Sequence, residues 1–260
     1  MEKYETLKLE KENDVLTVTL NREKNANAVN TKMIRELIKV ADWLREAPEI
    51  KFVVFTNQGK IFSAGADLYE LYDGLSGVEQ TSDQLRSMQI LGQEMMRKLE
   101  SIEQITISAL RGSAYGAGVA ILMTTDFRIM EESAILNLPE TNVGIFLTWG
   151  CTPRLVKAVG AVRAKELIML CEDVTAEESY SMGFINRVAA AENIDDEIQQ
   201  YVEKIRSKGN QSIRMTKKLI QATTAVNFGD IMIGETELVE KVLVSGETKN
   251  KMKDFVEREK

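Results

Sequence analysis

Hydrophobic and polar positions alternate at the start of the chain and then take up a helical period. Residues 5–10 and 15–20 are alternating or continuously apolar and are separated by a short polar segment, a pattern typical of a β-hairpin. Asn30 and Thr31 precede a stretch to about residue 45 in which apolar side chains recur every three or four positions. Because Asn and Thr are favourable N-caps, this stretch predicts an amphipathic helix.

Two later segments share one order of elements: a buried strand, a loop rich in small residues, and a helix. Residues 52–55 and 105–110 are short apolar runs that predict buried strands. A glycine-containing loop follows each run, at residues 57–65 and 112–118, and helices are predicted at 82–100 and 117–124. Residues 72–81 contain further glycines and are predicted to form a mobile loop. The first part of the chain is therefore expected to be a mixed α/β core.

Beyond residue 150 the pattern is helical almost throughout. The predicted helices cover residues 152–159, 163–170, 176–182, 194–207 and 212–225. No linker rich in Pro, Gly or Ser divides the chain. We therefore expect one continuous body, with a core at residues 1–195 and a helical C-terminal lobe at residues 196–260.

Composition and charge narrow the classes of partner. With a net charge of −7, the chain lacks the basic surface that nucleic-acid phosphates require. It has no apolar run of roughly 18 residues that would span a membrane, and residues 1–12 lack a signal-peptide pattern. Cys151 and Cys171 have neither disulfide nor metal-site spacing. We expect a cytoplasmic protein that binds neither nucleic acid nor membrane.

The absence of histidine restricts the chemistry more than any other feature of the composition. It excludes Ser-His-Asp and Cys-His nucleophilic arrangements and histidine-ligated metal sites. No metal site is expected. Acid–base chemistry near neutral pH must then use Glu, Asp, Lys, Tyr or Cys.

The small residues that follow the two apolar runs are suited to a backbone oxyanion hole. Residues 62–68 read FSAGADL and residues 111–118 read RGSAYGAG, and each segment leads towards a predicted helix. Helix N-termini leave N–H groups without intrahelical acceptors, and small side chains let a ligand approach them. A donor aimed at a developing oxyanion contributes about 3–4 kcal/mol to transition-state stabilisation. Each turn is also compatible with a simple strand-to-helix connection, and spacing alone leaves both interpretations open.

Short motifs spread along nearly the whole chain occur in the order found in one enzyme superfamily. They lie at residues 20–22, 27–28, 62–68, 112–118, 125–129, 139–140, 144, 176–185 and 252–258. In these segments the chain resembles the crotonase superfamily of enoyl-CoA hydratases and isomerases. The resemblance implies an α/β fold with a crotonase-like ββα spiral core and a helical C-terminal lobe that mediates trimers, often paired into hexamers. It also implies an acyl-CoA substrate, with coenzyme A as part of the substrate and no separate cofactor.

The same resemblance implies roles for individual residues. The N–H groups of Ala66 and Ala117 would form the oxyanion hole that holds the thioester carbonyl. Lys24 and Arg258, the latter from a neighbouring subunit, are candidates for the phosphates of coenzyme A, although surface cations commonly only face solvent. The full set of candidate substrate- and CoA-binding residues is Lys24, Ala26, Ala64, Asp67, Leu68, Tyr115, Gly116, Thr148, Trp149 and Arg258.

Ala120 and Glu140 decide which reaction the resemblance implies. Hydratases of the superfamily use two glutamates to hold and activate water; Ala120 occupies the position of the first and Glu140 that of the second. One carboxylate is sufficient to move a proton from C2 to C4 while an oxyanion hole carries the dienolate charge. The prediction is a Δ3,Δ2-enoyl-CoA isomerase whose base is Glu140, with a pKa raised by an apolar pocket. The alternative for Glu140 is a surface glutamate after Pro139.

Residues 146–151 depart from the superfamily, in which a proline and several glycines commonly line the acyl pocket at this position. Thr148 stands where the dehalogenase branch has a nucleophilic aspartate, so that chemistry is excluded. Trp149 is expected either to narrow the acyl site, which would favour a short or unusual acyl group, or to pack in the core. Tyr115 has the same two alternatives, lining the pocket or packing beneath it.

Other functions remain open on the same scaffold, because a fold does not select a reaction. They are an atypical hydratase or dehydratase, a decarboxylase of malonyl-type thioesters, an enzyme acting on acyl carrier protein, and a CoA-binding protein without activity. Clp-type serine proteases share the spiral fold, but the absence of histidine removes their triad.

Overall fold

The large sheet forms the centre of the molecule. The computed structural model describes residues 3–70, 82–224, 250, 253–254 and 257, without the side chains of 82–85 and 223–224. The strand order is β1-β2-β3-β5-β7-β10. The strands are β1 (Leu7–Glu12), β2 (Val15–Leu20), β3 (Phe52–Asn57), β5 (Ile105–Leu110), β7 (Phe127–Glu131) and β10 (Arg187–Ala189). The predicted hairpin is confirmed as the antiparallel pair β1–β2, and the other pairs in this sheet are parallel.

A second, smaller sheet runs in the order β4-β6-β8-β9. Its strands are β4 (Ile61–Ser63), β6 (Ser113–Tyr115), β8 (Ile135–Asn137) and β9 (Val174–Thr175). Strands β3, β5 and β7 of the large sheet are each followed along the chain by a strand of the small sheet, namely β4, β6 and β8. Each turn of the spiral therefore adds one strand to each sheet. The prediction that 57–65 and 112–118 are loops is wrong over β4 and β6. Three residues are too few to carry a strand period, and their partners lie about 50 positions away in sequence.

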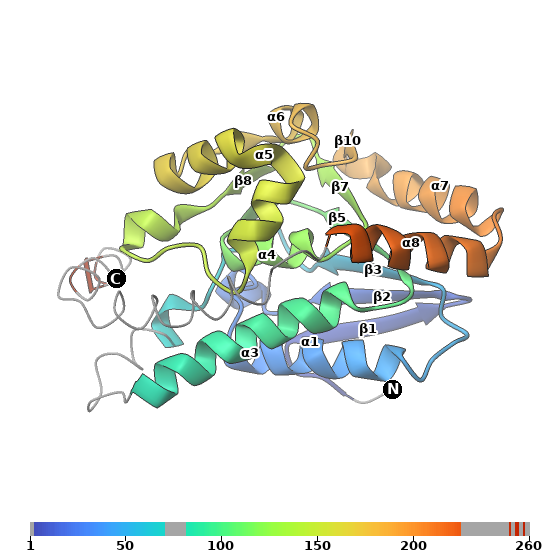
Figure 1. The fold of residues 1–260 in the computed structure, drawn as a ribbon, viewed down its shortest axis with the longest axis horizontal. Coiled ribbons are helices and arrows are strands. Elements are labelled where there is room, and N and C mark those ends of the chain that lie inside the picture. The colour runs from blue at the N-terminus through green and yellow to red at the C-terminus, as the bar shows by residue number, and fades with distance from the viewer. Residues whose placement is uncertain (1–2, 71–81, 225–249, 251–252, 255–256, 258–260) are drawn as a thin grey trace.

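The helices surround the two sheets (Figure 1). They are α1 (Thr31–Leu44), α3 (Ser82–Glu100), α4 (Ala117–Met123), α5 (Cys151–Leu170), α6 (Ala176–Ser181), α7 (Ile194–Arg206) and α8 (Asn210–Thr224). The predicted cap of α1 is confirmed, because the Asn30 side chain accepts a hydrogen bond from the Met33 N–H at 2.9 Å. The two helices expected at 152–159 and 163–170 are confirmed: α5 consists of two helical segments that meet at a kink at Gly160, where φ is 78° and ψ is 159°. The mobile loop predicted at 72–81 lies outside the described residues.

Strand β3 is buried on both faces and separates two layers of the core. Val53 and Phe55 pack in the cluster that contains the apolar faces of α1 and α3. Phe52 and Val54, which point to the opposite face, pack in a second cluster with residues of α7. Alternate side chains of a strand point to opposite faces, so helices on both sides explain why β3 is a continuous apolar run.

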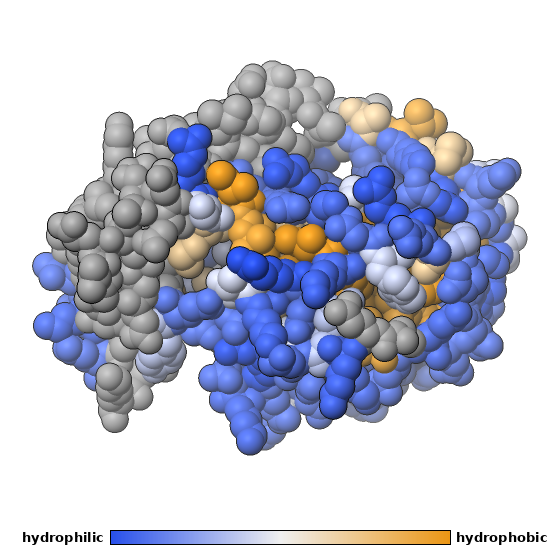
Figure 2. All heavy atoms as spheres, turned by 90° about the horizontal axis from the view of Figure 1, so that it is seen from below, coloured by the Kyte–Doolittle hydropathy of each residue, from blue (hydrophilic) through white to orange (hydrophobic). Residues whose placement is uncertain are grey.

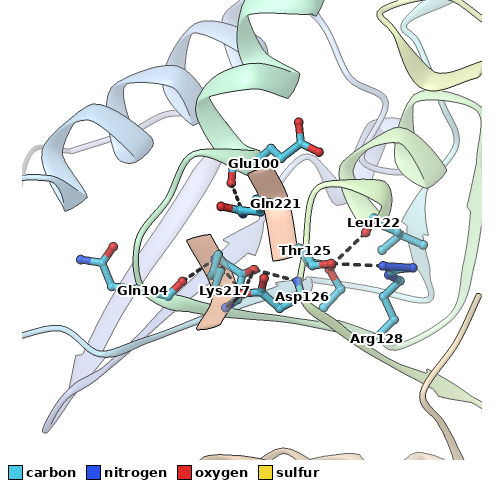
Figure 3. Close-up of polar contacts among 10 residues, drawn as sticks. Glu100, Gln104, Leu122, Thr125, Asp126, Arg128, Lys217 and Gln221 are labelled. Atoms are coloured by element: carbon cyan, nitrogen blue, oxygen red, sulfur yellow. Dashed lines mark hydrogen bonds and ion pairs between the residues drawn. The ribbon is translucent and has the colours of Figure 1, made fainter. Parts of the chain in front are cut away.

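Helix α8 is fixed to the core by a buried lysine (Figure 3). The Lys217 ammonium donates to the Gln104 carbonyl oxygen at 2.8 Å and to the Asp126 carboxylate at 2.7 Å. Burial lowers the pKa of Lys217, while the Asp126 charge acts in the opposite direction. Gln221, one turn further along α8, donates to the Glu100 carbonyl oxygen at 2.8 Å. These contacts join the first part of the predicted C-terminal lobe to the core; the lobe as a domain and its role in trimers stay predictions.

Most of the described surface is polar on the side viewed in Figure 2, which also shows an apolar strip in a hollow near the middle of that face. None of the helices in the described part of the chain is long and apolar enough to cross a lipid bilayer.

Candidate active site

Two glycine turns, one after β4 and one after β6, lie against each other. A Cβ atom added at Gly65 would lie 3.2 Å from the Tyr115 carbonyl oxygen and 3.8 Å from the Ala117 nitrogen. One added at Gly116 would lie 3.9 Å from Gly65 Cα. Both glycines have positive φ, 98° and 41°, which other residues rarely adopt. Glycine is therefore required at both positions for the turns to meet.

The N–H groups of Ala66 and Ala117 have no hydrogen-bond acceptor within the described part of the chain. Val29 bonds on either side of Ala66: its N–H donates to the Gly65 carbonyl at 2.7 Å, and its carbonyl accepts from Asp67 at 3.0 Å. Successive N–H groups of an extended segment point in opposite directions, so the Ala66 N–H points away from Val29. Ala117 is the first residue of α4, where an N–H has no intrahelical acceptor. Both alanines line one cavity of about 90 Å³ and have the arrangement expected of an oxyanion hole.

Glu140 brings a carboxylate to the same cavity from the short helix η2 (Pro139–Val143). A Cβ atom at Gly116 would lie 2.6 Å from Glu140 Oε1, so the carboxylate fits against the glycine turn only because no side chain is present there. Although the residue as a whole is partly exposed, its Oε2 atom is buried and has no hydrogen-bond partner in the described structure. Burial raises the pKa of Glu140 to about 7, and its own backbone N–H opposes the shift. A carboxyl group with this pKa can both take up and release a proton near neutral pH.

Among the described residues around Glu140, no second carboxylate is available for acid–base chemistry. Ala120, only 1% exposed, lines the cavity from α4 and offers no polar atom. Asp67 and Glu70 also line it, but both carboxylates are engaged elsewhere. Asp67 pairs with Arg22 at 3.0 Å, and Glu70 accepts from the Thr31 N–H at 2.9 Å.

Trp149 lines the cavity and also packs against the core. It lines the cavity in a left-handed backbone conformation with φ 58°. Its indole rests on Gly92 of α3, where an added Cβ would lie 2.3 Å from the ring nitrogen. The next carbonyl, that of Gly150, accepts from the Arg154 guanidinium at 2.8 Å, and Arg154 in turn pairs with Glu100 of α3 at 2.6 Å. Trp149 therefore lines the cavity and packs against α3, and its effect on the acyl site stays a prediction.

The structure brings some of the residues predicted from the sequence together and leaves others apart. Those that line the cavity are Ala66, Asp67, Gly116, Ala117, Glu140, Thr148 and Trp149. Those that do not line it are Lys24, Ala26, Ala64, Leu68 and Tyr115.

These five residues lie outside the wall of the cavity. Lys24 and Ala64 are exposed, Leu68 and Tyr115 are half-buried, and the Ala26 carbonyl accepts a hydrogen bond from the Ala64 N–H at 2.9 Å. Exposure at Lys24 and Ala64 is compatible with contact to a long ligand such as coenzyme A. Arg258 lies outside the described residues.

Helix α3 supplies cavity residues that the sequence did not indicate. Met88, Gln89 and Leu91 line the cavity, and Gly92 supports Trp149. A long helical pattern does not reveal which turn faces a site formed by distant segments. Gly92 could have indicated the turn of α3 that faces the site, because a glycine inside a helix often marks a place where another segment packs closely against it.

Comparisons with known proteins agree over nearly the whole chain. The sequence model of the family described as enoyl-CoA hydratase/isomerase matches residues 10–260. The short-chain-enoyl-CoA hydratase of Clostridium acetobutylicum is 31% identical over 253 residues, which cover 97% of this chain and 95% of that protein. The crotonyl-CoA hydratase of Syntrophomonas wolfei is 30% identical over 258 residues, covering 99% and 97%.

Solved structures agree with the architecture. The enoyl-CoA hydratase from Bacillus halodurans superimposes with a TM-score of 0.89 over 96% of this chain and 100% of that one, at 20% identity. The enoyl-CoA hydratase from Bacillus anthracis superimposes with a TM-score of 0.78 at 28% identity, over 98% and 97% of the two chains.

Proposed function

Because the chain belongs to the enoyl-CoA hydratase/isomerase family, we propose that it acts on an acyl-CoA thioester as a Δ3,Δ2-enoyl-CoA isomerase with Glu140 as its base. The crotonase-like α/β fold expected from the sequence is confirmed by the two sheets and by the structural neighbours. The observation that carries the proposal is one buried carboxylate beside two unused backbone N–H donors, with alanine at position 120.

In the proposed reaction the thioester oxygen accepts hydrogen bonds from the Ala66 and Ala117 N–H groups. Glu140 removes a proton from C2, and the electron pair moves through the conjugated system onto the thioester oxygen to give a dienolate. The same carboxyl group then gives a proton to C4, so the double bond moves from the 3,4 to the 2,3 position and no atom is gained or lost. The hydrogen bonds strengthen as charge develops on the oxygen, and this lowers the barrier. A pKa of about 7 lets Glu140 serve in both transfers.

A hydratase is the second candidate, supported by the relatives named as hydratases at 30–31% identity. Adding water across a double bond requires a group that orients and deprotonates the water. Ala120 cannot do this, and Asp67 and Glu70 are engaged by Arg22 and Thr31. The hydratase candidate therefore depends on Glu140 alone or on another polar residue of the cavity.

The test is to measure both reactions with the same purified protein. Conversion of a 3-enoyl-CoA to the 2-enoyl-CoA and hydration of crotonyl-CoA can each be followed by ultraviolet absorbance. The proposal predicts that isomerisation is the faster reaction and that Glu140→Gln lowers it by about 100-fold or more. Glu132→Gln, at an exposed position outside the cavity, is the matched control. Full isomerase activity in Glu140→Gln would exclude Glu140 as the base, and faster hydration would favour the hydratase candidate.

A further inference from the structure

Gln89 of α3 is a buried polar residue of the cavity that the proposed proton transfers do not use. It is 9% exposed and lines the same cavity as Ala120 and Glu140. Its side-chain oxygen, Oε1, is buried and accepts no hydrogen bond from any described residue. An unpaired amide oxygen here is an energetic cost of about 1–3 kcal/mol, which most buried polar groups avoid by finding a donor.

The cavity thus holds two kinds of unpaired polar atom. The N–H groups of Ala66 and Ala117 are donors and match a thioester oxygen. Gln89 Oε1 is an acceptor at any pH and Glu140 Oε2 is one when the carboxyl is ionised, and such an acceptor needs a partner that carries hydrogen on oxygen or nitrogen. The hydrocarbon part of an enoyl group has no such hydrogen, whereas a hydroxyl group or a water molecule does.

We propose that Gln89 accepts a hydrogen bond from an O–H group in the cavity shared with Glu140, either a hydroxyl on the acyl chain or a bound water. The proposal rests on the acyl-CoA function given above and extends it to hydroxyacyl-CoA thioesters, or to water as a co-reactant. The amide of Gln89 is neutral and can orient an O–H group without taking its proton, so any proton transfer falls to Glu140. Gln89 therefore supplies, from α3, the water- or hydroxyl-binding contact that Ala120 cannot make from α4.

The first experiment measures preference for a hydroxyl group. Dissociation constants for 3-hydroxybutyryl-CoA and butyryl-CoA are determined by calorimetry in a Glu140→Gln background, in which the amide cannot take a proton and turnover is suppressed. We expect the hydroxy ester to bind about tenfold more tightly, which is the scale of a hydrogen bond to a buried acceptor. Gln89→Leu is expected to bring the ratio close to one, and Gln89→Glu, which retains an acceptor, to preserve most of it. Gln93→Leu is the matched control, because Gln93 is a buried glutamine of the same helix that does not line the cavity.

The second experiment separates a substrate hydroxyl from bound water. Two proteins that retain Glu140, the wild type and Gln89→Leu, are compared. For each, the rate of crotonyl-CoA hydration is divided by the rate of 3-enoyl-CoA isomerisation. No hydroxyl preference together with at least about a tenfold fall in this ratio assigns the O–H group to water. A hydroxyl preference lost in Gln89→Leu assigns it to the substrate.

The proposal is overturned if Gln89→Leu changes neither the preference for the hydroxy ester nor the ratio of hydration to isomerisation. If Gln89→Leu does not fold, the same measurements on the proteins that retain Gln89 serve as the test. No hydroxyl preference and no measurable hydration would overturn the role of Gln89. Failure of both CoA esters to bind at all would instead remove the acyl-CoA function, and the role of Gln89 with it. Equal binding of the two esters together with unchanged reaction ratios leaves the acyl-CoA function intact and rejects Gln89 alone.

Discussion

Replacing Glu140 with glutamine is expected to stabilise the folded protein above pH 7 while it removes the proposed catalytic base. Burial raises the pKa of this carboxyl from 4.5 to about 7, so the folded protein binds the proton more tightly than the unfolded chain does. The stability of the wild-type protein must then fall as the pH rises from about 4.5 to about 7, and level off above that. At 1.36 kcal/mol for each pKa unit, the whole loss is about 3 kcal/mol.

Glutamine has nearly the same shape and carries no charge, so the variant is spared this loss. Urea unfolding of both proteins at pH 5 and pH 8 gives four free energies of unfolding. The difference between variant and wild type should grow by about 2.5 kcal/mol, or roughly 1 M in the urea midpoint, between these pH values, because about 1 kcal/mol of the loss has already occurred at pH 5. Glu132→Gln, at an exposed position, should show no comparable growth. An equal difference at pH 5 and pH 8 would refute the reasoning, because it would mean that the Glu140 carboxyl titrates alike in the folded and unfolded chain.

Four further expectations follow from contacts described above. For the proposed base, kcat/KM for isomerisation should rise with pH as Glu140 ionises and reach a plateau above about pH 7; a profile flat from pH 5 to pH 8 would contradict this. Ala117→Pro removes one donor at a helix position that tolerates proline, and kcat should fall by about 10²–10³ in steady-state assays. Gly92→Ala places a methyl group 2.3 Å from the indole nitrogen of Trp149; we expect a loss of about 1–3 kcal/mol by urea unfolding and a changed acyl-chain-length profile. Lys217→Met removes the ammonium that pairs with the half-buried Asp126 carboxylate, which keeps its hydrogen bonds from Thr106, and should cost about 1–3 kcal/mol in the same unfolding assay, whereas Lys218→Met, at an exposed position, should cost about 1 kcal/mol or less.

The local elements of this protein follow closely from its sequence. The β-hairpin, the Asn30-capped helix α1 and the long helix α3 all lie within a few residues of the bounds that the sequence predicts. Such elements depend on neighbours in the chain, since a strand repeats every two residues and a helix every 3.6. The short strands β4 and β6 escape prediction for the same reason: three residues carry no period, and the two strands are stabilised by pairing with each other and, for β6, with β8.

Residue types in the sequence also limit the chemistry. Without histidine, acid–base chemistry is left to Glu, Asp, Lys, Tyr and Cys. The choice of Glu140 as the candidate base, and the meaning of Ala120 as a missing second glutamate, come from the resemblance to the crotonase superfamily and stay predictions.

Only the tertiary structure decided how these residues meet. Three contacts join segments that are about 20–60 positions apart in the chain: Gly65 with Gly116, Gly116 with Glu140, and Gly92 with Trp149. The cavity role of Gln89 is of the same kind, because nothing in its local sequence distinguishes it from other polar residues of α3. Residue types and local periodicity are encoded along the chain. The distances between site residues and the desolvation of their polar groups arise only when remote segments pack. Packing therefore sets which N–H groups lack acceptors and what pKa the Glu140 carboxyl has.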